Sequence, residues 1–353
     1  MIQITSDFIG GNIKVLKIYN GTVLLKNELR DTAEDWFYWA FCVKGAAGKT
    51  LRFQFVEQNR VSYYGAAVSS DLSNWRWSES KGEGESFTYT FGPDENKVYF
   101  AHHMLYHPNQ FEKLAQKLQL PVRTLCISEK GRAVPCVEFG SGNRYILLTS
   151  RHHACESTGN YVLEGILEAL IETPIAGFRF LCVPFVDYDG VVDGDQGKSR
   201  IPHDHNRDYD VNTPAIYSSV RAIRAFAQAH PVVFGFDFHS PWHIGGENDT
   251  VFIVQKNPSQ IGRLNQFGEI LEHFCDSGNA LCYRHSNDIA PNVSWNRADT
   301  PCFANFVSSL DTSDIAFTLE TAYFGKDKFF PIKAINTGKR FVDALQEYIK
   351  TTS

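Results

Sequence analysis

The chain has 353 residues, of which 43% are hydrophobic and 21% are charged, and its formal net charge is -6 at pH 7. These values are ordinary for a globular protein of one or two domains. An acidic balance without a Lys/Arg block argues against a nucleic-acid partner. Because no apolar run approaches the length of a bilayer span, we also expect no membrane partner.

The N-terminus and the cysteines point to the cytoplasm. Residues 1–8 lack the positive and apolar regions of a secretion signal. The eight cysteines are scattered, mostly inside apolar stretches, and none forms a C-x-x-C pair. We therefore expect free, buried thiols in a reducing compartment.

The first hundred or so residues have the pattern of an all-β domain. Residues 14–19 alternate in polarity, Asn20-Gly21 follows as a turn, and residues 22–25 resume the strand, which predicts a hairpin. Two further strand-turn-strand patterns are expected at residues 36–43 with 51–56 and at residues 86–91 with 97–101. Short strands at this spacing favour an antiparallel β-sandwich.

From residue 108 the pattern changes to alternating helices and strands. Expected helices cover residues 108–118, 160–169, 216–230 and 334–350, and expected strands cover residues 145–149, 178–185, 232–238 and 315–319. Continuous apolar strands that alternate with helices predict an α/β domain with a mixed, largely parallel sheet covered on both faces. We divide the chain into a sandwich at 1–115 and an α/β domain at 116–353.

A possible metal site follows two of these strands. His153 and Glu156 form an H-x-x-E pair directly after residues 145–149, and His239 ends the run 232–238. Two His and one Glu leave a fourth position open, which is a ligand set of catalytic zinc. The spacing alone is weak evidence, because short motifs arise by chance.

Further segments in chain order strengthen this hypothesis. Asn206-Arg207 lies between the first pair and His239, and Glu320 lies in the strand-like segment 317–325. The ordered set resembles the M14 family of zinc carboxypeptidases, and most closely its cytosolic carboxypeptidase subfamily. Segments 36–38 (Trp-Phe-Tyr) and 98–101 (Val-Tyr-Phe-Ala) look like strands of the sandwich that precedes the zinc domain in that subfamily.

The resemblance implies a zinc metallocarboxypeptidase that hydrolyses the C-terminal peptide bond of a peptide or protein. One Zn²⁺ per chain would be bound by His153, Glu156 and His239. Glu320 would be the general base, because a carboxylate beside an activated water can move its proton to the leaving amine.

Two sets of cationic and amide groups would then bind the substrate. Asn206 and Arg207 would bind its terminal carboxylate, since a guanidinium pairs with carboxylate through two hydrogen bonds. Arg200 is the candidate for stabilising the oxyanion, with Lys198 as the alternative.

Some positions depart from the family pattern. The first motif reads His-His-Ala-Cys-Glu where subfamily members commonly have His-Pro-Gly-Glu. We expect His152 to support the site or to be exposed, and Asp237 could orient a ligand, because it shares strand parity with His239. The segment 285–306, including Arg297, should contribute to the specificity pocket, but its residues cannot be aligned individually.

Two other functions remain open on the sequence alone. A zinc-dependent N-acyl amino-acid amidohydrolase of the aspartoacylase type shares the zinc motif, although the N-terminal sandwich argues against it. A non-catalytic binding protein could use the aromatic-rich sandwich as its interaction surface, although the complete ligand set and Glu320 argue against that function. The sequence does not indicate an oligomeric state or a preferred terminal residue.

Overall fold

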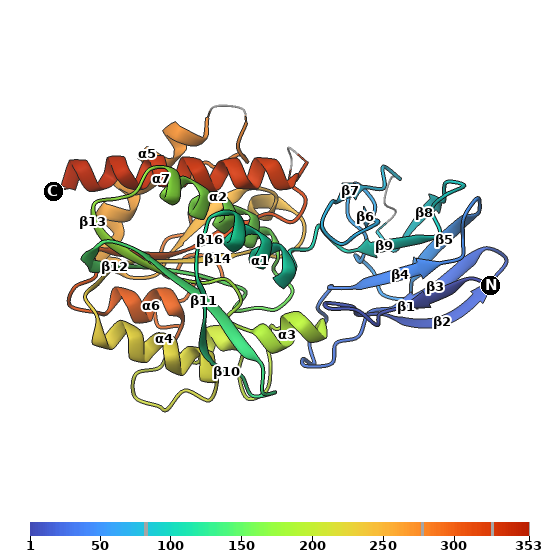
Figure 1. Ribbon diagram of the computed structural model, residues 1–353, viewed down its shortest axis with the longest axis horizontal. Helices are drawn as coiled ribbons and strands as arrows, with labels where there is room; N and C mark the ends of the chain where they lie inside the picture. Colours follow the sequence, from blue (N-terminus) through green and yellow to red (C-terminus); the bar gives the residue numbers. More distant parts are fainter. Residues whose placement is uncertain (81–83, 277–278, 326–327, 353) are drawn as a thin grey trace. The chain divides into compact units, whose positions relative to one another are not determined.

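The computed structural model describes residues 1–80, 84–276, 279–325 and 328–352 (Figure 1). The chain forms two compact units, and each is described by itself. The first combines Met1–His107 with Gly190–Ile201, and the second combines Pro108–Asp189 with Pro202–Ser353. Two features differ from the division at residue 115: the whole of α1 (Pro108–Lys117) lies in the second unit, and a segment from the middle of the chain joins the first.

The first unit is a β-sandwich of two sheets. Its strands are β1 (Gln3–Thr5), β2 (Lys14–Tyr19), β3 (Thr22–Lys26), β4 (Ala40–Lys44), β5 (Thr50–Phe55), β6 (Ala67–Ser69), β7 (Arg76–Trp77), β8 (Ser86–Thr90) and β9 (Lys97–Ala101). One sheet has the order β1-β4-β9-β6-β7 and the other β2-β3-β5-β8. All the strand pairs are antiparallel except β3 with β5.

The predicted hairpin is confirmed, and the other two strand-turn-strand segments connect the two sheets. Asn20 and Gly21 both have positive φ, 46° and 75°, as a tight turn between twisted strands requires. In contrast, β4 and β5 lie in different sheets, as do β8 and β9. Their aromatic side chains meet in the core instead, with the rings of Phe41 and Phe53 5.3 Å apart and those of Phe87 and Phe100 5.7 Å apart.

The second unit contains a seven-stranded mixed sheet. Its strands are β10 (Val122–Ile127), β11 (Ala133–Gly140), β12 (Gly142–Ser150), β13 (Gly177–Val183), β14 (Val232–His239), β15 (Val251–Gln255) and β16 (Ile315–Thr321), in the order β10-β11-β13-β12-β14-β16-β15. The four adjacent strands β13, β12, β14 and β16 are parallel to one another. The pairs at both edges are antiparallel.

Helices cover both faces of this sheet (Figure 1). They are α2 (Thr158–Glu172), α4 (Ser218–Ala229), α5 (Ile261–Cys275), α6 (Phe303–Ser308) and α7 (Pro331–Thr352). A further six-residue helix, α3 (Tyr188–Asp193), has most of its residues in the first unit. Helices α2, α5 and α7 pack together, whereas α6 packs on β14 and β16. The predicted mixed sheet with helices on both faces is confirmed.

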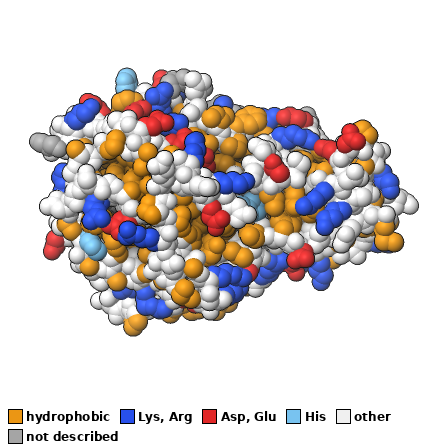
Figure 2. All heavy atoms as spheres, viewed as in Figure 1, with side chains coloured by type: hydrophobic (Ala, Val, Ile, Leu, Met, Phe, Trp, Pro, Cys, Tyr) orange, Lys and Arg blue, Asp and Glu red, His pale blue; other side chains and the backbone are white. Residues whose placement is uncertain are grey.

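The visible surface carries charges of both signs, and the cysteines are unpaired as predicted. Figure 2 shows acidic and basic side chains interspersed among apolar ones on the visible face. All eight cysteines are free thiols, and six of them are buried. Among the described helices, none is both long and apolar enough to cross a bilayer.

Candidate metal centre

The site lies where the central parallel strands end. Strand β14 pairs in parallel with β12 and β16, so that Asp237 lies beside Thr149 and His239 beside Glu320. Aligned residues of neighbouring strands point to the same face of a sheet. The carboxyl ends of parallel strands are where open α/β sheets bind ligands.

A tight loop after β12 presents His153 and Glu156. Arg151 has a left-handed backbone conformation, with φ of 60°, which is uncommon for a residue with a long side chain. Its buried guanidinium donates from Nε to the Ala154 carbonyl oxygen at 2.8 Å, and the Glu156 amide donates to the His153 carbonyl oxygen at 3.2 Å. These contacts fold the loop over the strand end.

Glu156 joins the two predicted histidine ligands. His153 Nδ1 lies 2.8 Å from Glu156 Oε1, and His239 Nδ1 lies 2.6 Å from Glu156 Oε2. The Ser240 amide also donates to Oε2, at 3.1 Å. Glu156 is fully buried, and the two histidines are 7% and 2% exposed. The structure therefore brings together all three residues that the sequence predicted as ligands.

This donor set fits a zinc ion. Two imidazole nitrogens and a carboxylate are typical zinc ligands, and ligand atoms of His153, Glu156 and His239 lie within 4.8 Å of one another. No thiolate belongs to this set: Cys155 Sγ lies 3.7 Å from the Tyr323 hydroxyl instead.

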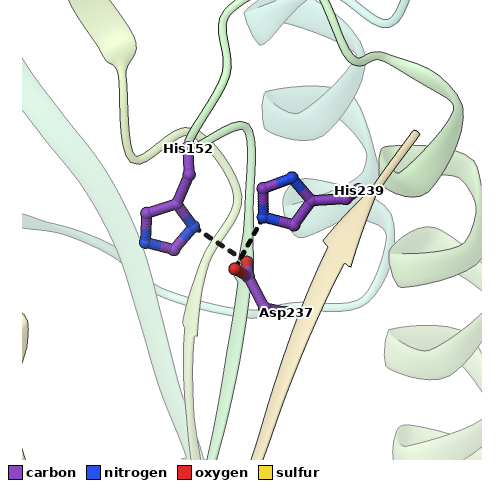
Figure 3. Close-up of side chains that lie close together, drawn as sticks. All are labelled: His152, Asp237 and His239. Atoms are coloured by element: carbon purple, nitrogen blue, oxygen red, sulfur yellow. Dashed lines mark hydrogen bonds and ion pairs between the residues drawn. The ribbon is translucent and has the colours of Figure 1, made fainter. Parts of the chain in front are cut away.

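His239 also belongs to a second group of possible ligands. His152, Asp237 and His239 are buried side chains whose ligand atoms likewise lie within 4.8 Å of one another. Figure 3 shows the Asp237 carboxylate between the two rings. His152 Nδ1 lies 2.8 Å from Oδ1, and His239 Nε2 lies 2.7 Å from Oδ2. The two groups thus use opposite nitrogens of the His239 ring.

Asp237 is suited to orienting His239. Burial raises the pKa of Asp237, but the charges and hydrogen bonds of His152 and His239 outweigh it, and the net pKa is lowered. The carboxyl group is therefore held as a carboxylate. Carboxylates commonly accept the ring N–H that faces away from a metal and so fix the tautomer of the ligand.

The residues around Asp237 hold it in place. Thr149 Oγ1 donates to Oδ1 at 2.8 Å, and the far nitrogen of His152 lies 2.7 Å from the Tyr209 hydroxyl. Burial lowers the pKa of His152, although Asp237 opposes this shift. His152 is completely buried, so it supports the site and is not exposed.

Asn206 and Arg207 lie on the short helix η1 (His205–Arg207), and the Asn206 side chain contacts a proposed ligand. Asn206 Oδ1 accepts from the Phe303 amide at 3.0 Å, which fixes the amide orientation. Its Nδ2 lies 3.1 Å from His239 Nε2. The Arg207 guanidinium is exposed and donates to the Asn206 carbonyl oxygen at 2.9 Å. Among the described residues, no carboxylate lies within ion-pair distance of it.

Glu320 lies next to His239 in the register of β14 and β16. Its side chain is buried, with 7% of the residue exposed. The strand carries it on the same face of the sheet as Asp237 and His239. The structure therefore places the predicted general base near the strand ends that carry the ligands.

Arg200 belongs to the first compact unit. Its guanidinium forms ion pairs with Asp31 at 2.7 Å and with Asp195 at 3.2 Å. The alternative, Lys198, places its ammonium 4.6 Å from the centre of the Trp36 ring. These contacts lie within that unit, so a role for either residue at the oxyanion stays a prediction.

Asp204 contacts a proposed metal ligand, and the sequence did not predict this contact. Asp204 Oδ1 lies 3.6 Å from His153 Nε2 and accepts from the Asn206 amide at 3.0 Å. It therefore links the first ligand to the segment that carries Asn206. Its position two residues before Asn206 was visible in the sequence, but that spacing alone does not reveal a contact with His153.

Comparisons with known proteins find similarity to cytosolic carboxypeptidases. Residues 4–103 match a family model described as the cytosolic carboxypeptidase N-terminal domain. An uncharacterized protein of Zymomonas mobilis is 27% identical over 256 residues, which are 67% of each chain. Cytosolic carboxypeptidase 2 of Xenopus tropicalis is 25% identical over 296 residues, or 67% of this chain. The chain spans only 30% of the length of that relative.

Solved structures show the same fold over the whole chain. A metallo-carboxypeptidase from Burkholderia cenocepacia has a TM-score of 0.83 at 17% identity and covers 100% of both chains. A metallo-carboxypeptidase from Pseudomonas aeruginosa, in complex with (2-guanidinoethylmercapto)succinic acid, has a TM-score of 0.78 at 18% identity and covers 99% of this chain and 100% of its own.

The chain therefore has the fold of the solved metallo-carboxypeptidases that it matches. The sequence matches confirm the predicted resemblance to the M14 carboxypeptidases of the cytosolic carboxypeptidase-like subfamily.

Replacing Asp237 tests its role toward the metal. We expect Asp237→Asn to weaken zinc affinity by about 10- to 100-fold, because the carboxylate no longer orients and polarises His239. Competition with a chromophoric chelator measures this affinity. The control Asp343→Asn removes a partly exposed partner of Arg340 on α7 and should leave the affinity unchanged. Equal zinc affinity of both variants would show that Asp237 has only a packing role.

Proposed function

We propose that this protein is a zinc-dependent carboxypeptidase that removes the last residue of a peptide or protein chain. The observation that carries the proposal is the convergence of His153 and His239 on Glu156, with Glu320 beside His239 in the sheet. One zinc ion per chain would be held by these three ligands. The M14 relatives support a peptide or protein C-terminus as the substrate.

The chemistry assigns Glu320 to proton transfer. Zinc at this position would polarise the scissile carbonyl and activate a water molecule near neutral pH. Glu320 would accept the proton of the attacking water and pass it to the nitrogen of the departing amino acid. Its buried position beside His239 suits this role, because a carboxylate is rarely buried in a strand without a task.

Asn206 and Arg207 would select a free C-terminus. The carbonyl oxygen of the Asn206 side chain is engaged by Phe303, so its amide hydrogens are the end that can donate to a carboxylate. Arg207 can add hydrogen bonds that are strengthened by charge. An internal peptide bond offers no carboxylate to this pair, which favours an exopeptidase.

The N-terminal sandwich favours this function over N-acyl amino-acid hydrolysis. Residues 4–103 match the family model of the cytosolic carboxypeptidase N-terminal domain. We also propose that the protein acts in the cytoplasm, which its eight free cysteines and the names of its relatives support.

Replacing the proposed base separates chemistry from metal binding. We expect Glu320→Gln to retain one zinc ion per chain and to lower kcat by about 10²- to 10⁴-fold, because the ligands remain and the base is lost. Metal analysis and turnover of a peptide substrate measure the two effects. If the variant loses its zinc, Glu320 is a ligand; if it keeps full activity, another group is the base.

Blocking the substrate carboxylate tests the selection of chain ends. We expect a C-terminally amidated peptide to be cleaved roughly a hundredfold more slowly than the free acid, because it loses the charge-assisted contact with Arg207. Arg207→Ala should show a similar loss on the free acid and little further loss on the amide.

The control for this test is Arg340→Ala, which removes an arginine of α7 that pairs with Asp343 and should leave kcat/KM unchanged. An N-acetyl amino-acid panel run in parallel tests the amidohydrolase. Equal cleavage of acid and amide by the unaltered protein would contradict the carboxypeptidase and leave the zinc site in place.

A further inference from the structure

Tyr217 precedes α4 directly and is the residue at the N-terminal cap of that helix, but its side chain makes no capping hydrogen bond. Ser, Thr, Asp and Asn are preferred at this position, because their side chains accept from the first amides of a helix. A tyrosine offers no such advantage. We therefore looked for another use of its ring and hydroxyl.

Two carboxylates accept from the amides at the start of α4 instead. Asp208 accepts from the Ile216 amide at 3.1 Å and from the Tyr217 amide at 2.9 Å. Glu129, from the turn between β10 and β11, accepts from the Ser218 amide at 2.7 Å. Negative charge is favourable at a helix N-terminus. The start of the helix is thus satisfied without the side chain of Tyr217.

The Tyr217 side chain contacts two residues that closely precede Asn206. Its hydroxyl donates to the His203 carbonyl oxygen at 2.6 Å. Its ring stacks on the His205 imidazole, with the centroids 3.7 Å apart and the planes inclined by 18°. His205 is 3% exposed, and its Nε2 lies 3.8 Å from Asp187 Oδ1. The imidazole is thus held at its face by the tyrosine and at its edge by the carboxylate.

Asp208 fixes the other end of the same segment. This buried carboxylate places Oδ1 2.9 Å from His203 Nε2, and it also accepts from the Tyr217 amide. The residues on both sides of the Asn206–Arg207 pair are therefore attached to position 217. All of these residues belong to the second compact unit.

The guanidinium of Arg207 follows the position of this turn. It is exposed and donates to the Asn206 carbonyl oxygen at 2.9 Å, and the Arg207 amide donates to the Asp204 carbonyl oxygen at 3.0 Å. Both bonds stay within the segment, so neither fixes the segment to the rest of the domain. A misplacement of about 1 Å in a group that positions a substrate can cost roughly 10²-fold in rate.

We propose that Tyr217 is a positioning residue for the binding of the substrate's terminal carboxylate. It acts by fixing His203 and His205, which precede the Asn206–Arg207 pair, so that the guanidinium and the amide keep their place. This inference rests on the proposed carboxypeptidase function. Because Tyr217 acts through this pair, its loss should matter for a substrate with a free C-terminus and not for one without.

Two variants of Tyr217 test the proposal on a peptide and its C-terminally amidated form. Tyr217→Leu removes the stacking and the hydroxyl, and it should lower kcat/KM on the free acid by about 10- to 100-fold. Tyr217→Phe keeps the ring and should lose about 2- to 10-fold. On the amide, both should match the unaltered protein. Zinc affinity, measured by competition with a chelator, should not change, because the proposed ligands keep their contacts.

A double variant tests whether Tyr217 acts through Arg207. The variant Arg207→Ala already lacks the guanidinium, so adding Tyr217→Leu should lower kcat/KM on the free acid by at most about threefold further. Tyr19→Leu replaces a tyrosine that is 42% exposed on β2; it is the matched control and should equal the unaltered protein. Urea unfolding of each variant shows that the losses come from folded enzyme.

Four results would overturn the inference. They are an equal loss on acid and amide, a loss of zinc affinity, losses that multiply in full in the double variant, and free-acid activity that neither Tyr217 variant lowers. The first two would show that Tyr217 supports the whole site. If Tyr217→Leu does not fold, Tyr217→Phe decides, and its equality with the unaltered protein on the free acid overturns the inference.

Failure of the underlying function is visible in the unaltered protein. Zinc-loaded protein that releases no terminal residue, or that cleaves acid and amide equally, would overturn the proposed carboxypeptidase and this inference with it. A protein that prefers the free acid, together with variants that keep this preference in full, would overturn the role of Tyr217 alone.

Discussion

The site depends on Glu156, a fully buried carboxylate that holds one ring nitrogen of His153 and one of His239 close together. His153 and His239 come from positions 86 residues apart in the sequence, yet both direct Nδ1 to this one group. A buried carboxylate is costly unless it is paired or bound to a metal. The burial of Glu156 is therefore consistent with its use as a metal ligand, and removing either histidine would leave a poorly compensated charge.

His239 is held from both sides. Glu156 faces its Nδ1 and Asp237 faces its Nε2, so the two carboxylates fix the plane of the ring. Burial lowers the pKa of His239, but Asp237 and Glu156 outweigh burial and raise it well above the usual range. Two carboxylates around one ring attract positive charge, which either a proton or a metal ion can supply. The strand register then sets Glu320 beside this ring.

Much of this arrangement could be predicted from the sequence, because local spacing encodes it. The H-x-x-E pair after an apolar strand identified His153 and Glu156, and strand parity indicated that Asp237 could orient His239. The Asn20-Gly21 hairpin likewise follows from two adjacent residues that tolerate positive φ. The pairing of β15 with β16 could not be predicted, because it depends on contacts between segments that lie more than 60 residues apart.

The central claim is that a zinc ion binds at Nδ1 of His239, together with His153 and Glu156. The same ring offers Nε2 to the alternative group of His152 and Asp237, so the position of the ion decides between them. Anomalous diffraction from crystals of the zinc-loaded protein, recorded on both sides of the zinc absorption edge, measures that position directly. We expect one peak about 2.0–2.2 Å from His153 Nδ1, His239 Nδ1 and Glu156. A peak between His152, Asp237 and His239 Nε2, or no peak near His239, would contradict the account.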